Sequence, residues 1–157
     1  AALGQTLIEH YLRGETVMML FRKSSDKLLI SNHIETVVRV DSSLPPEQRR
    51  LRQLTYHSAR GLQADAVFML GDCQYLTSSP YKNQVYRMAG LGRTGDAQPF
   101  DSAQKDEAQR LAYVGVTRAI RHCYWHVEAV SGEAAALHRA SSQVQGRQAF
   151  FEDLRGQ

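Results

Sequence analysis

Two polar segments of this chain combine arginines with glycine in a way that suits phosphate chemistry. Residues 55–67 read TYHSARGLQADAV, and residues 107–119 read EAQRLAYVGVTRA. An arginine presents a planar fork of N–H donors that matches phosphate oxygens, and fifteen of the nineteen basic residues are arginine. Gly61 permits a tight turn and a close approach of the backbone to a ligand. These residue types predict phosphate recognition. The net charge of +3 is by itself weak evidence for binding to nucleic acid.

Each of these residues also has an ordinary structural interpretation. Arg118 lies near the end of a predicted helix, where a cation complements the helix dipole by about 0.3–1 kcal/mol. Arg110 comes two helical turns earlier and could share a face with Arg118 or lie on the surface. His57 could be a satisfied histidine beneath a turn. The arginines clustered at residues 49–52 could form a solvated helix face.

The elements that must position these segments alternate between strands and helices, which predicts an α/β fold with a parallel, doubly wound sheet. We expect strands at residues 16–21, 34–40, 54–56, 64–70 and 122–129. We expect helices at residues 2–13, 24–32, 82–88, 102–119 and 133–139, a helix or turn at 45–52, and a further apolar segment at 150–154. Asp101 and Gln104 fit a capping box at the start of the helix at 102–119.

Composition narrows the class of protein. A chain of 157 residues suits one compact domain, and no stretch reaches the roughly 20 apolar residues of a membrane span. Cys73 and Cys123 adjoin apolar runs, so we expect buried free thiols in a reducing cytoplasm. The first residue is Ala1, which favours a fragment or a processed chain.

Two other candidate sites are rejected. The glycine-rich stretch at 90–95 lacks a GK[ST] sequence and a preceding strand, so we interpret it as a flexible loop. His122, Cys123 and His126 do not predict a metal site, because in a strand Cys123 points away from the two histidines.

The two segments carry a family resemblance. Residues 54–67 resemble motif V of UvrD/Rep-type superfamily 1 DNA helicases, T-x-H-x-x-K-G-L-E-x-D-x-V, and residues 107–119 resemble motif VI, E-x-x-R-L-x-Y-V-x-x-T-R-A. Residues 17–22 (VMMLFR) resemble the strand that opens the nucleic-acid face of the same domain. Arg60 replaces the usual lysine. Gln63 replaces the usual glutamate, and a glutamine at this position resembles the helicase IV branch.

This resemblance implies a RecA-like three-layer sandwich, the C-terminal motor domain (domain 2A) of such a helicase, over residues 1–157. Arg118 would be the arginine finger, and it would contact ATP together with Gly61 and Gln63. A surface for single-stranded DNA would include Arg22, Thr55, His57 and Arg60. About thirty residues separate Arg22 from the motif V segment, too few for the inserted 2B domain.

The partner of this domain would be the first RecA-like domain of the same protein. No G-x-x-x-x-G-K-[ST] motif occurs in the chain, and Walker B acids are missing, so ATP and Mg²⁺ would be bound mainly by that partner. The chain alone would then be inactive. A non-catalytic DNA-binding or scaffolding module derived from a helicase is the alternative. The helicase interpretation requires the Arg118 side chain to lie near the 55–63 turn and outside the interior.

Overall fold

The computed structural model describes residues 2–71, 73 and 79–126. The segments expected at residues 127–129, 133–139 and 150–154 lie outside these residues.

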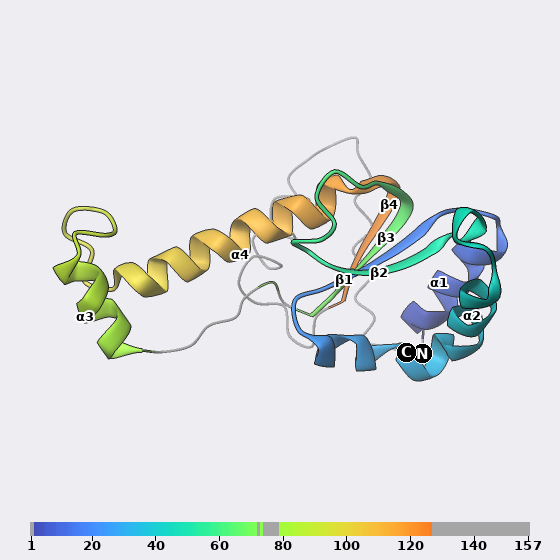
Figure 1. Cartoon of the computed structure of the whole chain (residues 1–157), viewed down its shortest axis with the longest axis horizontal. Coiled ribbons are helices and arrows are strands. Elements are labelled where there is room, and N and C mark those ends of the chain that lie inside the picture. The colour runs from blue at the N-terminus through green and yellow to red at the C-terminus, as the bar shows by residue number, and fades with distance from the viewer. Residues whose placement is uncertain (1, 72, 74–78, 127–157) are drawn as a thin grey trace.

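A four-stranded, all-parallel sheet forms the centre of the fold (Figure 1). Its strands are β1 (Val17–Phe21), β2 (Leu51–Thr55), β3 (Ala64–Leu70) and β4 (Ala119–His126), in the spatial order β2-β1-β3-β4. The apolar runs that predicted β1 and β3 are buried throughout β1 and at six of the seven positions of β3. The predicted parallel α/β sheet is therefore confirmed.

Helices cover both faces of this sheet. Helices α1 (Ala2–Leu12) and α2 (Ser31–Ser43) pack on one face, and the C-terminal half of α4 (Pro99–Thr117) packs on the other. A hydrophobic core lies on each face of the sheet, and alternate side chains of each strand point into one core or the other. In β1, Met19 faces α1 and α2, whereas Met18 faces α4. The result is a three-layer arrangement consistent with a RecA-like sandwich. Between β1 and β2 the chain forms the 3₁₀ helix η1 (Ser24–Leu29), the 13-residue α2 and a second short 3₁₀ helix.

The prediction of a strand at residues 34–40 is wrong, because this segment belongs to α2. Its β-branched residues favour a strand when taken alone. The buried positions, however, are Ile34, Val37 and Asp41, at the three- and four-residue spacing of a helix face. Packing of that face on the α1 side of the sheet overrides the weak local preference.

The arginines near residue 50 do not form a helix face. A short 3₁₀ helix, η2 (Pro46–Gln48), leads directly into β2, which starts three residues earlier than expected. Arg49 donates hydrogen bonds to two carbonyl groups at the end of α2. Arg50 donates to the carbonyl oxygen of Tyr11 and lies over the Tyr11 ring. These two guanidinium groups hold α1, α2 and β2 together.

Helix α4 begins at Pro99, earlier than expected, and the predicted capping box does not cap it. The N-terminal cap comes instead from Asn83 in α3 (Pro80–Met88), whose Oδ1 accepts hydrogen bonds from the N–H groups of Phe100 and Asp101. The N-terminal half of α4 and α3 extend beyond the sheet as an arm (Figure 1). The predicted short helix within residues 72–100 is thus confirmed.

Strand β4 starts at Ala119, directly after α4, so it begins three residues before the expected position. Tyr124 packs with the core under α1, and Cys123 and Trp125 pack with the core under α4. Cys73 is buried and Cys123 is half-buried, and neither is in a disulfide within the described residues. Burial raises the pKa of the Cys123 thiol to about 12. Within the described ranges, no helix combines the length and apolar character that a membrane crossing requires.

Candidate phosphate-binding site

The segment after β2 crosses the α4 face of the sheet before β3 begins, because β1 lies between β2 and β3. Tyr56 and Ala59 are buried against α4 and fix this crossing segment. The N–H of Ala59 donates to the carbonyl of Thr55, and the N–H of Leu62 donates to that of Ala59. Gly61 follows with a φ of +78°, a conformation that glycine adopts without strain. The 55–63 turn is therefore a packed element.

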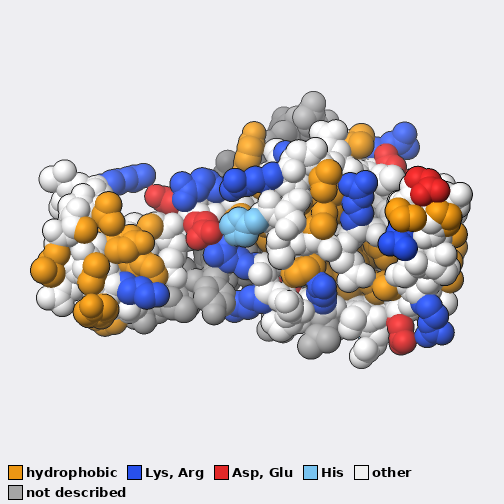
Figure 2. All heavy atoms as spheres, viewed as in Figure 1, with side chains coloured by type: hydrophobic (Ala, Val, Ile, Leu, Met, Phe, Trp, Pro, Cys, Tyr) orange, Lys and Arg blue, Asp and Glu red, His pale blue; other side chains and the backbone are white. Residues whose placement is uncertain are grey.

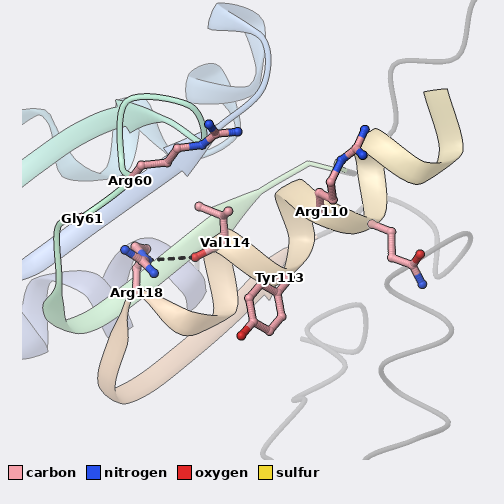
Figure 3. Close-up of a pocket in the computed structure, with 7 residues that line it drawn as sticks. Arg60, Gly61, Arg110, Tyr113, Val114 and Arg118 are labelled. Carbon is pink, nitrogen blue, oxygen red and sulfur yellow. Dashed lines mark hydrogen bonds between the residues drawn. The ribbon is translucent and has the colours of Figure 1, made fainter. Parts of the chain in front are cut away.

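A pocket of about 620 Å³ opens between this turn and the C-terminal half of α4. Arg60 and Gly61 line it from the turn (Figure 3). From α4 the lining residues are Gln109, Arg110, Tyr113, Val114 and Arg118. Among the described residues of this lining, three are arginines and none is acidic. The pocket therefore suits an anion. Arg110 is exposed and lines the same pocket as Arg118, so both possibilities considered for it from the sequence hold.

Arg118 is held beside the 55–63 turn by neutral acceptors. Its Nε donates to the carbonyl oxygen of Val114 at 3.2 Å, and its Nη1 donates to that of Leu62 at 3.4 Å. Its Nη2 lies 3.2 Å from Oγ1 of Thr117. The side chain is half-buried, and it forms no ion pair with any residue of the described ranges. A cation with neutral partners keeps its charge available for a ligand anion.

The backbone places Arg118 at the amino edge of the sheet. The N–H of Ala64, the first residue of β3, donates to the carbonyl oxygen of Arg118 at 3.0 Å. Gln63, just before Ala64, is exposed and is not among the residues that line the pocket. Gly61 and Arg118 thus meet at the pocket, and Gln63 lies next to it in the chain.

A second group of expected residues lies at the opposite, carboxyl edge of β1 and β2. Arg22 follows β1, and its Nη2 lies 3.4 Å from Oε2 of Glu107. His57 follows β2, and its Nε2 lies 3.7 Å from Oε1 of the same carboxylate. Oγ1 of Thr55, the last residue of β2, is 2.9 Å from the hydroxyl oxygen of Ser58. Parallel strands bring these residues to one edge, as expected for a ligand surface.

The expected DNA-binding group is divided between the two sites. Arg22 and His57 converge on α4, whereas Arg60 lines the pocket. Figure 2 shows basic side chains gathered over α4 on this face of the molecule, with acidic ones between them. Sequence reasoning missed Glu107 as a site residue. Its position in the motif VI pattern was the available signal, but only the fold shows that it meets Arg22 and His57.

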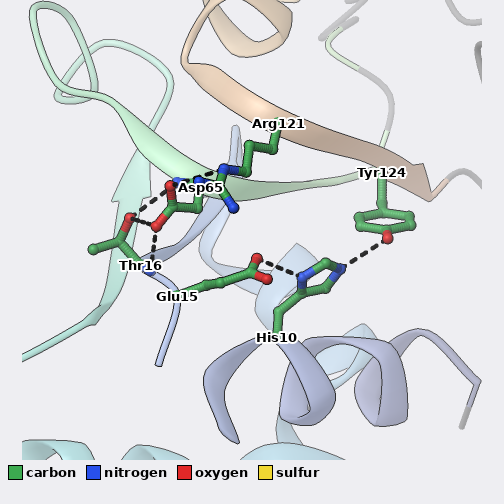
Figure 4. A network of polar contacts seen from close by, with 6 residues as sticks. All are labelled: His10, Glu15, Thr16, Asp65, Arg121 and Tyr124. Carbon is green, nitrogen blue, oxygen red and sulfur yellow. Dashed lines mark hydrogen bonds and ion pairs between the residues drawn. The ribbon is translucent and has the colours of Figure 1, made fainter. Parts of the chain in front are cut away.

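A separate polar network ties the amino ends of the strands to α1 (Figure 4). His10 is buried, and its ring nitrogens lie 2.8 Å from Glu15 Oε2 and 2.8 Å from the hydroxyl oxygen of Tyr124. Asp65 accepts hydrogen bonds from the N–H and the hydroxyl group of Thr16, each at 3.0 Å. This network supports the edge of the sheet from which Arg118 extends.

Comparison with known proteins gives one relevant similarity. No model of a known protein family matches the chain. A stretch of 85 residues is 27% identical to the ATP-dependent DNA helicase Rep of Buchnera aphidicola, and it covers 54% of this chain and 10% of that protein. This similarity supports a relationship to Rep-type DNA helicases. The matched stretch therefore spans about a tenth of the length of that relative.

Proposed function

We propose that this chain is the C-terminal RecA-like motor domain of an ATP-dependent DNA helicase or translocase. Arg118 would act as its arginine finger, and the first RecA-like domain of the same protein would bind most of the nucleotide. The observation that carries the proposal is the half-buried Arg118, held at the pocket by carbonyl oxygens instead of a carboxylate. The similarity to Rep supports the same conclusion.

The chemistry of the pocket fits the polyphosphate of ATP. Hydrolysis concentrates negative charge on the γ-phosphoryl group, and a guanidinium placed there stabilises the transition state. Arg118 would supply that charge, and Arg60 and Arg110 would add to the field around it. Mg²⁺ prefers carboxylate ligands, which the described lining lacks, so the metal would be held by the partner domain.

Single-stranded DNA would lie along the carboxyl edge of β1 and β2. Arg22, Thr55 and His57 are on this edge, and α4 connects it to the pocket. Arg60 would contact phosphate from the pocket side. A single long helix that serves both sites gives a physical link between nucleotide state and DNA contact. Closure of the two domains on ATP would then move one of them along the strand.

The Arg118→Ala variant of the complete protein tests the finger assignment. We expect kcat for DNA-stimulated ATP hydrolysis to fall by about 10³-fold or more, with ATP binding largely retained, because the finger acts mainly in the transition state. Arg118→Lys keeps the charge but loses the planar fork, so it should recover only part of the rate.

Arg121→Ala is the matched control. Arg121 lies on β4 outside the pocket and is within 3.9 Å of Asp65. Its removal changes the net charge equally and should change kcat by less than about threefold, as expected for an exposed pair. A loss below tenfold in Arg118→Ala would reject the finger and favour the non-catalytic DNA-binding module.

A further inference from the structure

One carboxylate links an arginine and a histidine at the carboxyl edge of the sheet. The two oxygens of Glu107 lie 3.4 Å from Nη2 of Arg22 and 3.7 Å from Nε2 of His57. Arg22 comes from the end of β1 and His57 from the segment after β2, whereas Glu107 belongs to α4. The position between Arg22 and His57 is therefore occupied by a carboxylate of the protein itself.

The donors of Arg22 are only partly used by this contact. The Arg22 side chain is 18% exposed, and its Nη1 is buried without a hydrogen-bond partner among the described residues. A guanidinium has five N–H donors in a rigid fork, and a carboxylate at 3.4 Å uses them poorly. Glu107 and His57 are 40% and 56% exposed, so an anion from solvent can reach the same position.

We propose that Glu107 is a built-in competitor for phosphate at Arg22 and His57. In the free protein its carboxylate occupies the place of a phosphate oxygen. An incoming phosphate, which pairs with an arginine fork more strongly, displaces it. This inference rests on the proposed function and adds a residue that regulates the same surface. The phosphate comes either from a nucleic-acid strand or from a bound nucleotide.

Helix α4 connects Glu107, which phosphate would displace, with residues of the pocket. Val114 and Arg118 follow Glu107 by seven and eleven residues, so they lie along the same side of the helix. The contact of Glu107 with Arg22 and His57 therefore adds a partly exposed tether between the carboxyl edge of the sheet and the helix that leads to Arg110 and Arg118. Its loss removes this tether, while the buried packing of α4 on the sheet remains. Phosphate binding at the carboxyl edge is thereby connected to the pocket.

The test measures binding of a fluorescent oligothymidylate to the complete protein at low salt. We expect Glu107→Gln to bind about two- to fivefold more tightly than wild type, because it removes the competing charge of an exposed pair. Glu107→Asp keeps the charge but shortens the reach, so it should tighten binding less. Melting temperatures check that both variants fold.

Asp106→Asn is the control for a general charge effect. Asp106 is the exposed neighbour of Glu107 on α4, and it forms no ion pair with the residues that the structure describes. Asp106→Asn should raise the affinity for the oligonucleotide by less than half as much as Glu107→Gln. In an Arg22→Ala background, the gain in affinity from Glu107→Gln should fall toward that from Asp106→Asn, because Arg22 is gone and only the longer contact of His57 with Glu107, at 3.7 Å, is left.

A second probe identifies the source of the phosphate. A fluorescent, non-hydrolysable ATP analogue with Mg²⁺ is measured without DNA. Tighter binding of the oligonucleotide alone assigns the exchange to the strand, and tighter binding of the analogue alone assigns it to the nucleotide. Unchanged or weaker binding of both probes by Glu107→Gln would overturn the proposal and make Glu107 a structural support. Failure of wild type to bind either probe would overturn the proposed function as well.

Discussion

Asp65 shows how a single side chain of the 55–67 segment stabilises the sheet. Its carboxylate accepts two hydrogen bonds from Thr16, and the Thr16 hydroxyl oxygen accepts one from the N–H of Asp65 at 2.9 Å. The two residues thereby join the amino ends of β1 and β3 (Figure 4). The hydrogen bonds from Thr16 lower the pKa of Asp65 below its ordinary value of 3.8. Folding therefore favours the charged carboxylate of Asp65.

The pH dependence follows from the sign of that pKa shift. A carboxyl group with a lower pKa in the folded state stabilises the protein above its unfolded pKa, and this contribution is lost as the pH falls through the folded pKa. We expect Asp65→Asn to lower the free energy of unfolding at pH 7. The difference from wild type should be constant above about pH 5 and shrink below about pH 4.

Urea unfolding of both proteins between pH 3 and pH 7 measures this difference. Asp106→Asn serves as the control, because the described structure gives its carboxylate no ion pair. A difference that stays constant down to pH 3 would show that the charge of Asp65 is unimportant.

At the scale of elements, α4 is the structural link between the two candidate sites. Its 19 residues span about 28 Å, and the N-terminal half is held by α3, far from the sheet. Its C-terminal half packs closely on β3 and the crossing segment through Ala108, Leu111, Ala112 and Gly115. The position of Arg118 therefore depends on how closely this half approaches the sheet.

Gly115→Ala tests this approach. A Cβ at position 115 would lie 2.7 Å from Cε of Met69 and 2.9 Å from Cε1 of Tyr56. Overpacking costs about 1–3 kcal/mol, whereas the higher helix propensity of alanine returns about 1 kcal/mol. We expect a net loss of up to about 2 kcal/mol in the free energy of unfolding, measured by urea denaturation.

Val116→Ala is the comparison for this variant. Val116 is the next residue of α4 and is 36% exposed, so the change should cost less than about 1 kcal/mol. A Gly115→Ala variant more stable than wild type would show only the gain in helix propensity and would mean that α4 can move away from the sheet. Arg118 would then have a less fixed position than its hydrogen bonds indicate.

At the scale of the whole molecule, the chain has three arginines around one pocket but no phosphate-binding loop of the P-loop type. We expect millimolar Mg-ATP to raise the melting temperature of the 157-residue chain by less than about 1 °C, because a ligand stabilises a protein only as far as it binds the folded state. The complete protein should be stabilised by several degrees under the same conditions. A shift of several degrees for the chain alone would reveal a nucleotide site of its own.

The sequence predicted the elements whose signals are local. Continuous apolar runs identified β1 and β3, because a strand between two helix layers is buried on both faces. Alternation along the chain predicted the parallel sheet. The segment at 34–40 was assigned wrongly, because its β-branched residues describe a local preference while its burial depends on α1 and the sheet. The cap of α4 was also missed, since Asn83 belongs to another helix.

By itself, the sequence determined the layered α/β class, the positions of the two motif-like segments and the absence of a P-loop motif within these 157 residues. The tertiary structure alone decided which charged groups meet. It placed Arg118 against the carbonyl of Leu62 and Glu107 between Arg22 and His57. These pairings depend on the strand order and on the angle at which α4 crosses the sheet. Both follow from packing over long sequence separations, which local patterns do not record.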